Sequence, residues 1–229
     1  MNTNEKFVIT INRELGSGGR TVGRKLAEKL GVQFYDKALI NALEEKYNLS
    51  VEEIEKLKGQ SHTWWAELKR AFTASDPSMN YSQMKAAIDI KRQNGEIPML
   101  PDFENAEPTT EDMFLAEVEI LKSIAREESC IVAGRSGFYV FRDHPNHLSI
   151  LIQASMPFRI ERVMRKQNIS EKEARKTIEK VDKMRENYVK EYTKTSRYVT
   201  RNYDLVISAD GKSEDEIANL ILNYIGVKS

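Results

Sequence analysis

The stretch of the chain best suited to chemistry is a glycine-rich turn that ends in an arginine and a threonine. It follows the apolar run Phe7–Ile11. Backbone N–H groups in such a turn, together with the positive end of a following helix, form a nest that binds anions. The turn is therefore a candidate phosphate site, and a threonine in its first helical turn is suited to magnesium. Its residues are Gly16, Ser17, Gly18, Gly19, Arg20 and Thr21.

The turn departs from the usual phosphate-binding loop, or P-loop, which reads G-x-x-x-x-G-K-[ST]. With Thr21 on the last position of that pattern, Glu14 stands where the first glycine belongs and Arg20 where the lysine belongs. Arginine keeps the positive charge but presents a planar fork instead of a compact ammonium group. A purely structural turn with a solvent-exposed arginine remains the alternative.

Short apolar runs alternate with longer amphipathic ones along the chain. We expect strands at 7–11, 32–35, 131–133, 148–153 and 205–208, and helices at 21–30, 37–47, 110–127, 157–166, 170–194 and 214–224. Such alternation predicts an α/β fold in three layers, with a parallel sheet of about five strands and helices on both faces. Ligands of such sheets bind at the carboxyl ends of the strands, where the glycine-rich turn is expected.

The pattern weakens between residues 59 and 108. This region holds Trp64 and Trp65 and lacks a clear strand signal. We interpret it as a helical insertion that shapes a substrate pocket, and the two tryptophans as packing residues. His144 and His147 bracket Pro145 and Asn146, and we interpret both histidines as turn residues, because no third metal ligand is near.

Composition narrows the class of protein. The 229 residues contain 35 Lys and Arg and 35 Asp and Glu, so the formal net charge is zero. This balance argues against a general nucleic-acid binder. The single cysteine, Cys130, lies in an apolar run and is expected in the core. No signal peptide or membrane-spanning stretch is evident, so we expect a soluble cytoplasmic protein without membrane partners.

Several blocks in a fixed order resemble the cytidylate kinase-like family, a branch of the P-loop nucleoside monophosphate kinases. They are I-T-I-N-R-E-L-G-S-G-G-R-T-V-G-R-K-L-A-E-K-L-G at 9–31, F-Y-D-K at 34–37, V-A-G-R at 132–135, A-S-M-P-F-R-I-E-R at 154–162, D-K-M-R-E-N-Y at 182–188 and N-Y-D-L-V-I-S at 202–208. The resemblance implies one P-loop kinase domain over 1–229, with a substrate-binding insertion at about 48–109 and a helical lid at about 168–202.

The resemblance also implies ATP as phosphoryl donor, Mg²⁺ as cofactor and CMP or dCMP as first candidates for the acceptor. The glycine-rich turn would hold the ATP phosphates, and Thr21 the metal. The catalytic residues implied are Arg20, Arg159, Arg162 and Arg185. The acceptor-binding residues implied are Asp36, Arg135, Asp182 and Arg185. Whether the protein is a monomer or a homodimer stays open.

Each of these residues has a plainer interpretation. Asp36 could cap the helix that follows it. Asp182 and Arg185 could form an exposed helical ion pair, and Arg159 and Arg162 a solvated helix face.

Two departures leave the acceptor open. Ser136 replaces the aspartate of the family's G-R-D motif, and the 59–108 insertion does not resemble the cytidylate kinase insertion. A P-loop kinase for another small acceptor, or a nucleotide-binding module without turnover, therefore remain as alternatives.

Overall fold

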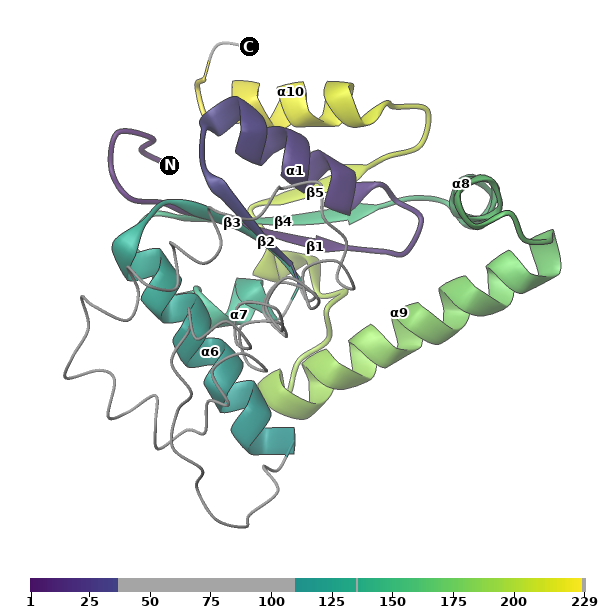
Figure 1. Cartoon of the computed structure of the whole chain (residues 1–229), viewed down its shortest axis with the longest axis horizontal. Helices are drawn as coiled ribbons and strands as arrows, with labels where there is room; N and C mark the ends of the chain where they lie inside the picture. The colour runs from purple at the N-terminus through teal and green to yellow at the C-terminus, as the bar shows by residue number, and fades with distance from the viewer. Residues whose placement is uncertain (37–109, 135, 228–229) are drawn as a thin grey trace, which may run out of the picture. The chain divides into compact units, whose positions relative to one another are not determined.

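The computed structural model describes residues 1–36, 110–134 and 136–227 (Figure 1). The chain divides into two compact units, one formed by 1–37 with 121–229 and the other by 38–120. Most of the second unit, including the expected helix at 37–47, the insertion at 48–109 and both tryptophans, lies outside the described residues. The architecture below is that of the first unit.

Five parallel strands form one sheet in the order β2-β3-β1-β4-β5. Their bounds are β1 (Val8–Arg13), β2 (Gln33–Asp36), β3 (Cys130–Ala133), β4 (His147–Gln153) and β5 (Leu205–Ser208). Because every pair is parallel, all five carboxyl ends meet at the same edge of the sheet. The strand–helix alternation of the sequence thus predicted the sheet correctly.

Strand β1 continues two residues beyond its predicted end. Asn12 and Arg13 pair with Leu151 and Ile152 of β4, which is longer than the apolar run of β1. The strand therefore ends at Arg13, not at Ile11. This places the Arg13 side chain at the carboxyl edge of the central strand.

Helices cover both faces of the sheet (Figure 1). On one face lie α1 (Gly19–Leu30) and α10 (Glu214–Tyr224), and on the other α7 (Gly137–Val140) and the end of α9 (Glu171–Thr193). The other helices within the described residues are α6 (Thr110–Glu127), α8 (Met156–Gln167) and the 3₁₀ turn η1 (Thr200–Asn202). Helix α7 was not predicted, because four residues are too few to show a helical period.

The apolar core separates into two faces along β4. Ile150 and Ile152 point toward Leu26 of α1 and Ile221 of α10, and all four side chains are fully or almost fully buried. The intervening Leu151 points the other way, as alternate strand residues do.

One expectation about the turns is wrong. His147 is the first residue of β4 instead of a turn residue. Cys130, in contrast, is buried as expected, and burial raises the pKa of its thiol to about 12.

His147 is held in a neutral form. Its Nε2 lies 2.8 Å from Thr10 Oγ1, and burial lowers the pKa of the imidazole to about 4. A histidine with a lowered pKa resists protonation in the folded state but accepts a proton readily in the unfolded state.

The core makes a direct stability prediction. Leu26→Ala removes a fully buried side chain from α1, and we expect it to lower the free energy of unfolding by about 2–5 kcal/mol. Urea unfolding followed by circular dichroism measures this. Leu220→Ala, at a 42% exposed position of α10, is the control and should cost less than about 1 kcal/mol. Equal losses for the two variants would contradict the described core.

His147 makes a prediction about acid stability. Above pH 6.5 the imidazole is neutral in both states, and below it the unfolded state gains protons first. The free energy of unfolding should therefore fall by about 1–2 kcal/mol more between pH 7 and pH 5 in the wild-type protein than in His147→Gln. Urea unfolding at both pH values tests this, and identical acid sensitivity of the two proteins would refute it.

Candidate functional site

The loop from Glu14 to Gly18 joins β1 to α1. Gly16 has φ +88°, and a Cβ atom there would lie 2.8 Å from the carbonyl oxygen of Arg159, so only glycine fits. The N–H and Oγ of Ser17 both donate to the Glu14 carbonyl oxygen, at 3.3 and 3.0 Å. No side chain among the described residues caps α1, whose first N–H groups are thus suited to an anion.

Arg20 and Asp36 come together, although they were predicted for different halves of the site. Arg20 Nη2 lies 2.5 Å from Asp36 Oδ2, and Arg24 approaches the same oxygen at 3.9 Å. The Arg20 side chain is 53% exposed, whereas the Asp36 side chain at the end of β2 is almost buried. Whether Asp36 also caps a helix lies outside the described residues.

Glu14, which takes the place of the first P-loop glycine, ties the loop to the end of β4. Its Oε2 accepts a hydrogen bond from the Ala154 N–H at 2.9 Å and lies 3.8 Å from Arg159 Nε. The unusual residue is therefore a brace between the loop and α8. The substitution is visible in the sequence, but this role of Glu14 is not.

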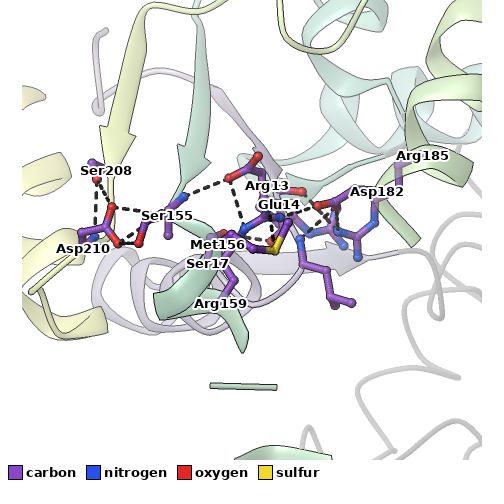
Figure 2. A network of polar contacts seen from close by, with 12 residues as sticks. Arg13, Glu14, Ser17, Ser155, Met156, Arg159, Asp182, Arg185, Ser208 and Asp210 are labelled. Carbon is purple, nitrogen blue, oxygen red and sulfur yellow. Dashed lines mark hydrogen bonds and ion pairs between the residues drawn. The ribbon is translucent and has the colours of Figure 1, made fainter. Parts of the chain in front are cut away.

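Asp182 joins α9 to the loop. One carboxylate oxygen accepts from the Leu15 N–H at 3.0 Å, and the other from Arg159 Nη1 at 2.5 Å. Arg185 Nη1 lies 3.6 Å from the first oxygen. Figure 2 shows this network running from Asp210 and Ser155 through Glu14 and Arg159 to Asp182 and Arg185.

The plainer interpretations of these residues are wrong. Asp182 and Arg159 are each 7% exposed, so neither belongs to a surface ion pair or a solvated helix face. Arg162 is also buried, but in a different place. It pairs with Glu214 at the start of α10 and packs against Gly18, so the described site does not bring it to Asp182.

Two further arginines lie in this cluster and were missed. Arg13 ends β1, and its carbonyl oxygen accepts hydrogen bonds from Arg185 at 3.2 Å and from Arg197. Arg197 is fully buried, between α9 and η1. An arginine directly after a central strand was a usable signal for Arg13. No local signal marked Arg197, because its segment has neither a motif nor a helical period.

Few contacts are described for the remaining predicted site residues. Arg135 lies outside the described residues. Ser136 follows it with φ +52°, and its buried Oγ has no hydrogen-bond partner within the described part of the chain. Thr21 is half-buried on the first turn of α1.

The arrangement fits phosphate groups. Helix N–H groups and the exposed Arg20 meet at one sheet edge with buried guanidinium nitrogens, such as Arg159 Nε, that have no hydrogen-bond partner among the described residues. Across residues 1–36, 110–134 and 136–227, no group of three or more His, Cys, Asp or Glu side chains is arranged to hold a metal ion. Mg²⁺ bound through substrate phosphates and one hydroxyl needs no such group.

Within the described ranges, no helix is both long and apolar enough to span a membrane. The chain has no significant match among curated proteins.

This chain is similar to solved structures, one of them clearly in fold. An uncharacterized protein from Eubacterium ventriosum has a TM-score of 0.64 and 21% sequence identity, over 97% of this chain and 99% of that one. Shikimate kinase from Bacteroides thetaiotaomicron has a TM-score of 0.48 and 11% identity, over 96% and 99% of the two chains. Similarity at these identities concerns the fold alone.

Family comparison covers most of the chain. Residues 8–210 match the cytidylate kinase-like family. The match extends from β1 through the glycine-rich loop, α8 and α9 to the end of β5, and the five-stranded parallel sheet is that of the P-loop kinase fold. The chain therefore belongs to the cytidylate kinase-like family.

Proposed function

We propose that the protein is an ATP- and Mg²⁺-dependent kinase that transfers a phosphoryl group to a nucleoside monophosphate, with CMP and dCMP as first candidates. One observation carries the proposal. Cationic side chains from α1, α8 and α9 converge at the carboxyl edge of the sheet, around a loop with uncapped N–H groups. Phosphoryl transfer requires little covalent chemistry from a protein, but it does require positioning and charge neutralisation.

The loop and α1 form the donor half of the site. Backbone N–H groups of Gly16–Thr21 bind the ATP phosphates, and Arg20 turns from Asp36 to phosphate oxygens. Its half-exposed side chain leaves room for this exchange. The Thr21 hydroxyl would help to hold Mg²⁺, which when bound would supply neutralisation of part of the phosphate charge.

Asp182 organises the transfer half. It holds Arg159 by a short charge-assisted hydrogen bond and keeps Arg185 within 3.6 Å. Glu14 approaches the same Arg159 guanidinium from the loop side. Donors fixed before the reaction stabilise developing charge without reorganising, and this is the role we assign to Arg159 and Arg185. Arg162 can join them only by leaving Glu214.

The acceptor half comprises Asp36, Arg135, Asp182 and Arg185. A different small acceptor is the second candidate, since Ser136 offers a buried hydroxyl, without a hydrogen-bond partner in the described part of the chain, where the family's G-R-D motif carries a carboxylate. That change alters hydrogen bonding to an acceptor base without affecting the phosphate loop.

Arg20 tests the donor half. In a coupled assay of ADP formation across the common nucleoside monophosphates, Arg20→Ala should lower kcat/KM by about 10²–10³, because one charged donor to the transferring phosphates is lost. Lys25→Ala is the matched control, since Lys25 lies on the same helix but pairs with Asp215 at 2.8 Å. It should retain activity within about twofold.

The same panel separates the alternatives. Transfer confined to an acceptor that is not a nucleotide would select the second candidate. ATP binding by calorimetry without transfer to any acceptor would show a nucleotide-binding module and sink the catalytic proposal.

Asp182 tests the transfer half. Asp182→Asn keeps the shape but removes the charge that fixes Arg159, so kcat should fall about 10- to 100-fold while the affinity for ATP changes little. A steady-state assay of ADP formation measures kcat, and calorimetry measures the affinity for ATP. Glu179→Gln, at an exposed position of α9, is the control. A loss of ATP binding without a loss of kcat would contradict the assignment.

A further inference from the structure

A second cavity lies on the face of the sheet that α7 covers, away from the phosphate loop. Its volume is about 540 Å³, and its described lining comes from α7, the start of β4, the end of α9 and η1. His147 and Ser149, the first and third residues of β4, belong to this lining, so the cavity lies toward the amino edge of the sheet. None of the described residues assigned above to phosphate binding or transfer lines it. The cavity is therefore separate from the candidate site.

Aromatic side chains give the cavity apolar surface. The rings of Phe138 and Tyr203, both buried, have centroids 5.2 Å apart. The guanidinium of Arg142 lies over the Tyr139 ring, 4.6 Å from its centroid, and the Arg142 side chain is 58% exposed. Aromatic rings and guanidinium groups both stack on planar groups. This part of the lining thus suits a ligand that contains a planar ring.

Hydrogen-bond donors of the lining lack acceptors within the described part of the chain. Asn202 Nδ2 is buried and has no partner there. The neighbouring Arg201 is exposed, and its side chain makes no ion pair or hydrogen bond with a described residue. His144 Nδ1 accepts from the Asn146 N–H at 3.2 Å, which leaves the proton of the neutral ring on Nε2. Because buried donors are normally paired, this set favours a ligand rich in acceptor oxygens.

The charges of the lining favour an anion. Its described charged side chains are those of Arg142, Arg201 and Asp204. Asp204 is already engaged, because its Oδ2 accepts hydrogen bonds from the N–H and the Oγ of Ser149, at 2.7 and 3.0 Å. Arg142 pairs with the exposed Asp143 at 3.2 Å. The Arg201 guanidinium is thus the cation that has no counter-ion among the described residues.

We propose that this cavity is a second ligand site, separate from the phosphate loop, for a small organic anion with a planar ring. Arg201 and Asn202 Nδ2 bind its carboxylate or phosphate group, and His144 Nε2 is a third donor. The ring packs on the stacked Tyr139 and Arg142 side chains. The volume is in the range of pockets for ligands of this size. The site stands whether or not the protein transfers phosphate, because these residues take no part in the proposed reaction.

Imidazole NMR signals test the site, because two of the three histidines of the chain, His144 and His147, line the cavity. The full chain is titrated with benzoate, an aromatic carboxylate, and with AMP, an aromatic phosphate. The signal of His144, assigned with His144→Gln, should shift saturably with at least one of them. Adenosine, which has the ring without the charge, should bind at least about tenfold more weakly. The tighter of the two anions identifies the anionic group. Equal affinity for adenosine, or no saturable shift with either anion, overturns the proposal.

Variants place the ligand. Arg201→Met should weaken binding of the tighter anion at least about tenfold, and its unchanged midpoint of thermal unfolding should show that this exposed position is not needed for folding. Arg175→Met, at an exposed position of α9 outside the cavity, is the matched control and should bind normally. Arg20→Ala in the phosphate loop should leave the His144 titration unchanged. Wild-type affinity in Arg201→Met, or lost binding in Arg20→Ala, would refute a second site.

Discussion

The carboxylate of Asp182 is the contact on which the candidate site depends. It lies on α9, far from the loop in sequence, yet it accepts a hydrogen bond from the Leu15 N–H and another from Arg159. A single buried side chain therefore fixes three elements against one another: the loop, α8 and α9. The charge of Asp182 is tolerated at 7% exposure only because several guanidinium groups surround it.

Glu14 provides the corresponding brace on the other side of Arg159. In the standard P-loop a glycine occupies this position, and the loop is shaped mainly by backbone. Here the Glu14 carboxylate reaches the Ala154 N–H, and its carbonyl oxygen accepts from Ser17. The Glu14 side chain thus anchors the loop to the end of β4. The residue that departs from the usual P-loop sequence therefore has a structural role.

The sequence predicted what depends on local pattern. Apolar runs located all five strands, and helical spacing placed α1 and α9 close to their observed bounds. The order of the motifs led us to expect Arg20, Arg159, Asp182 and Arg185 in one site, and all four lie at the carboxyl edge of the sheet.

What the sequence did not predict depends on neighbours distant in the chain. The last two residues of β1 are polar, and only their pairing with β4 makes them strand. Arg197 carries no apolar signal, because charged side chains are normally exposed, and its burial follows from the cluster it joins. Arg159 and Arg162 both match the family motif, but only Arg159 pairs with Asp182. Arg162, three residues further along α8, pairs with Glu214.

The central place of β1 has a consequence for how the protein is assembled. Both neighbours of β1 come from much later in the chain, since β1 pairs with β3 at Cys130 and with β4 at His147. Pairings of such long sequence separation are costly in loop-closure entropy and slow to form. The phosphate loop precedes α9 in the chain, and the Leu15 N–H of the loop finds its acceptor only after α9 has emerged to supply Asp182. Nascent chains that end before α9 therefore contain the whole glycine-rich motif without this contact.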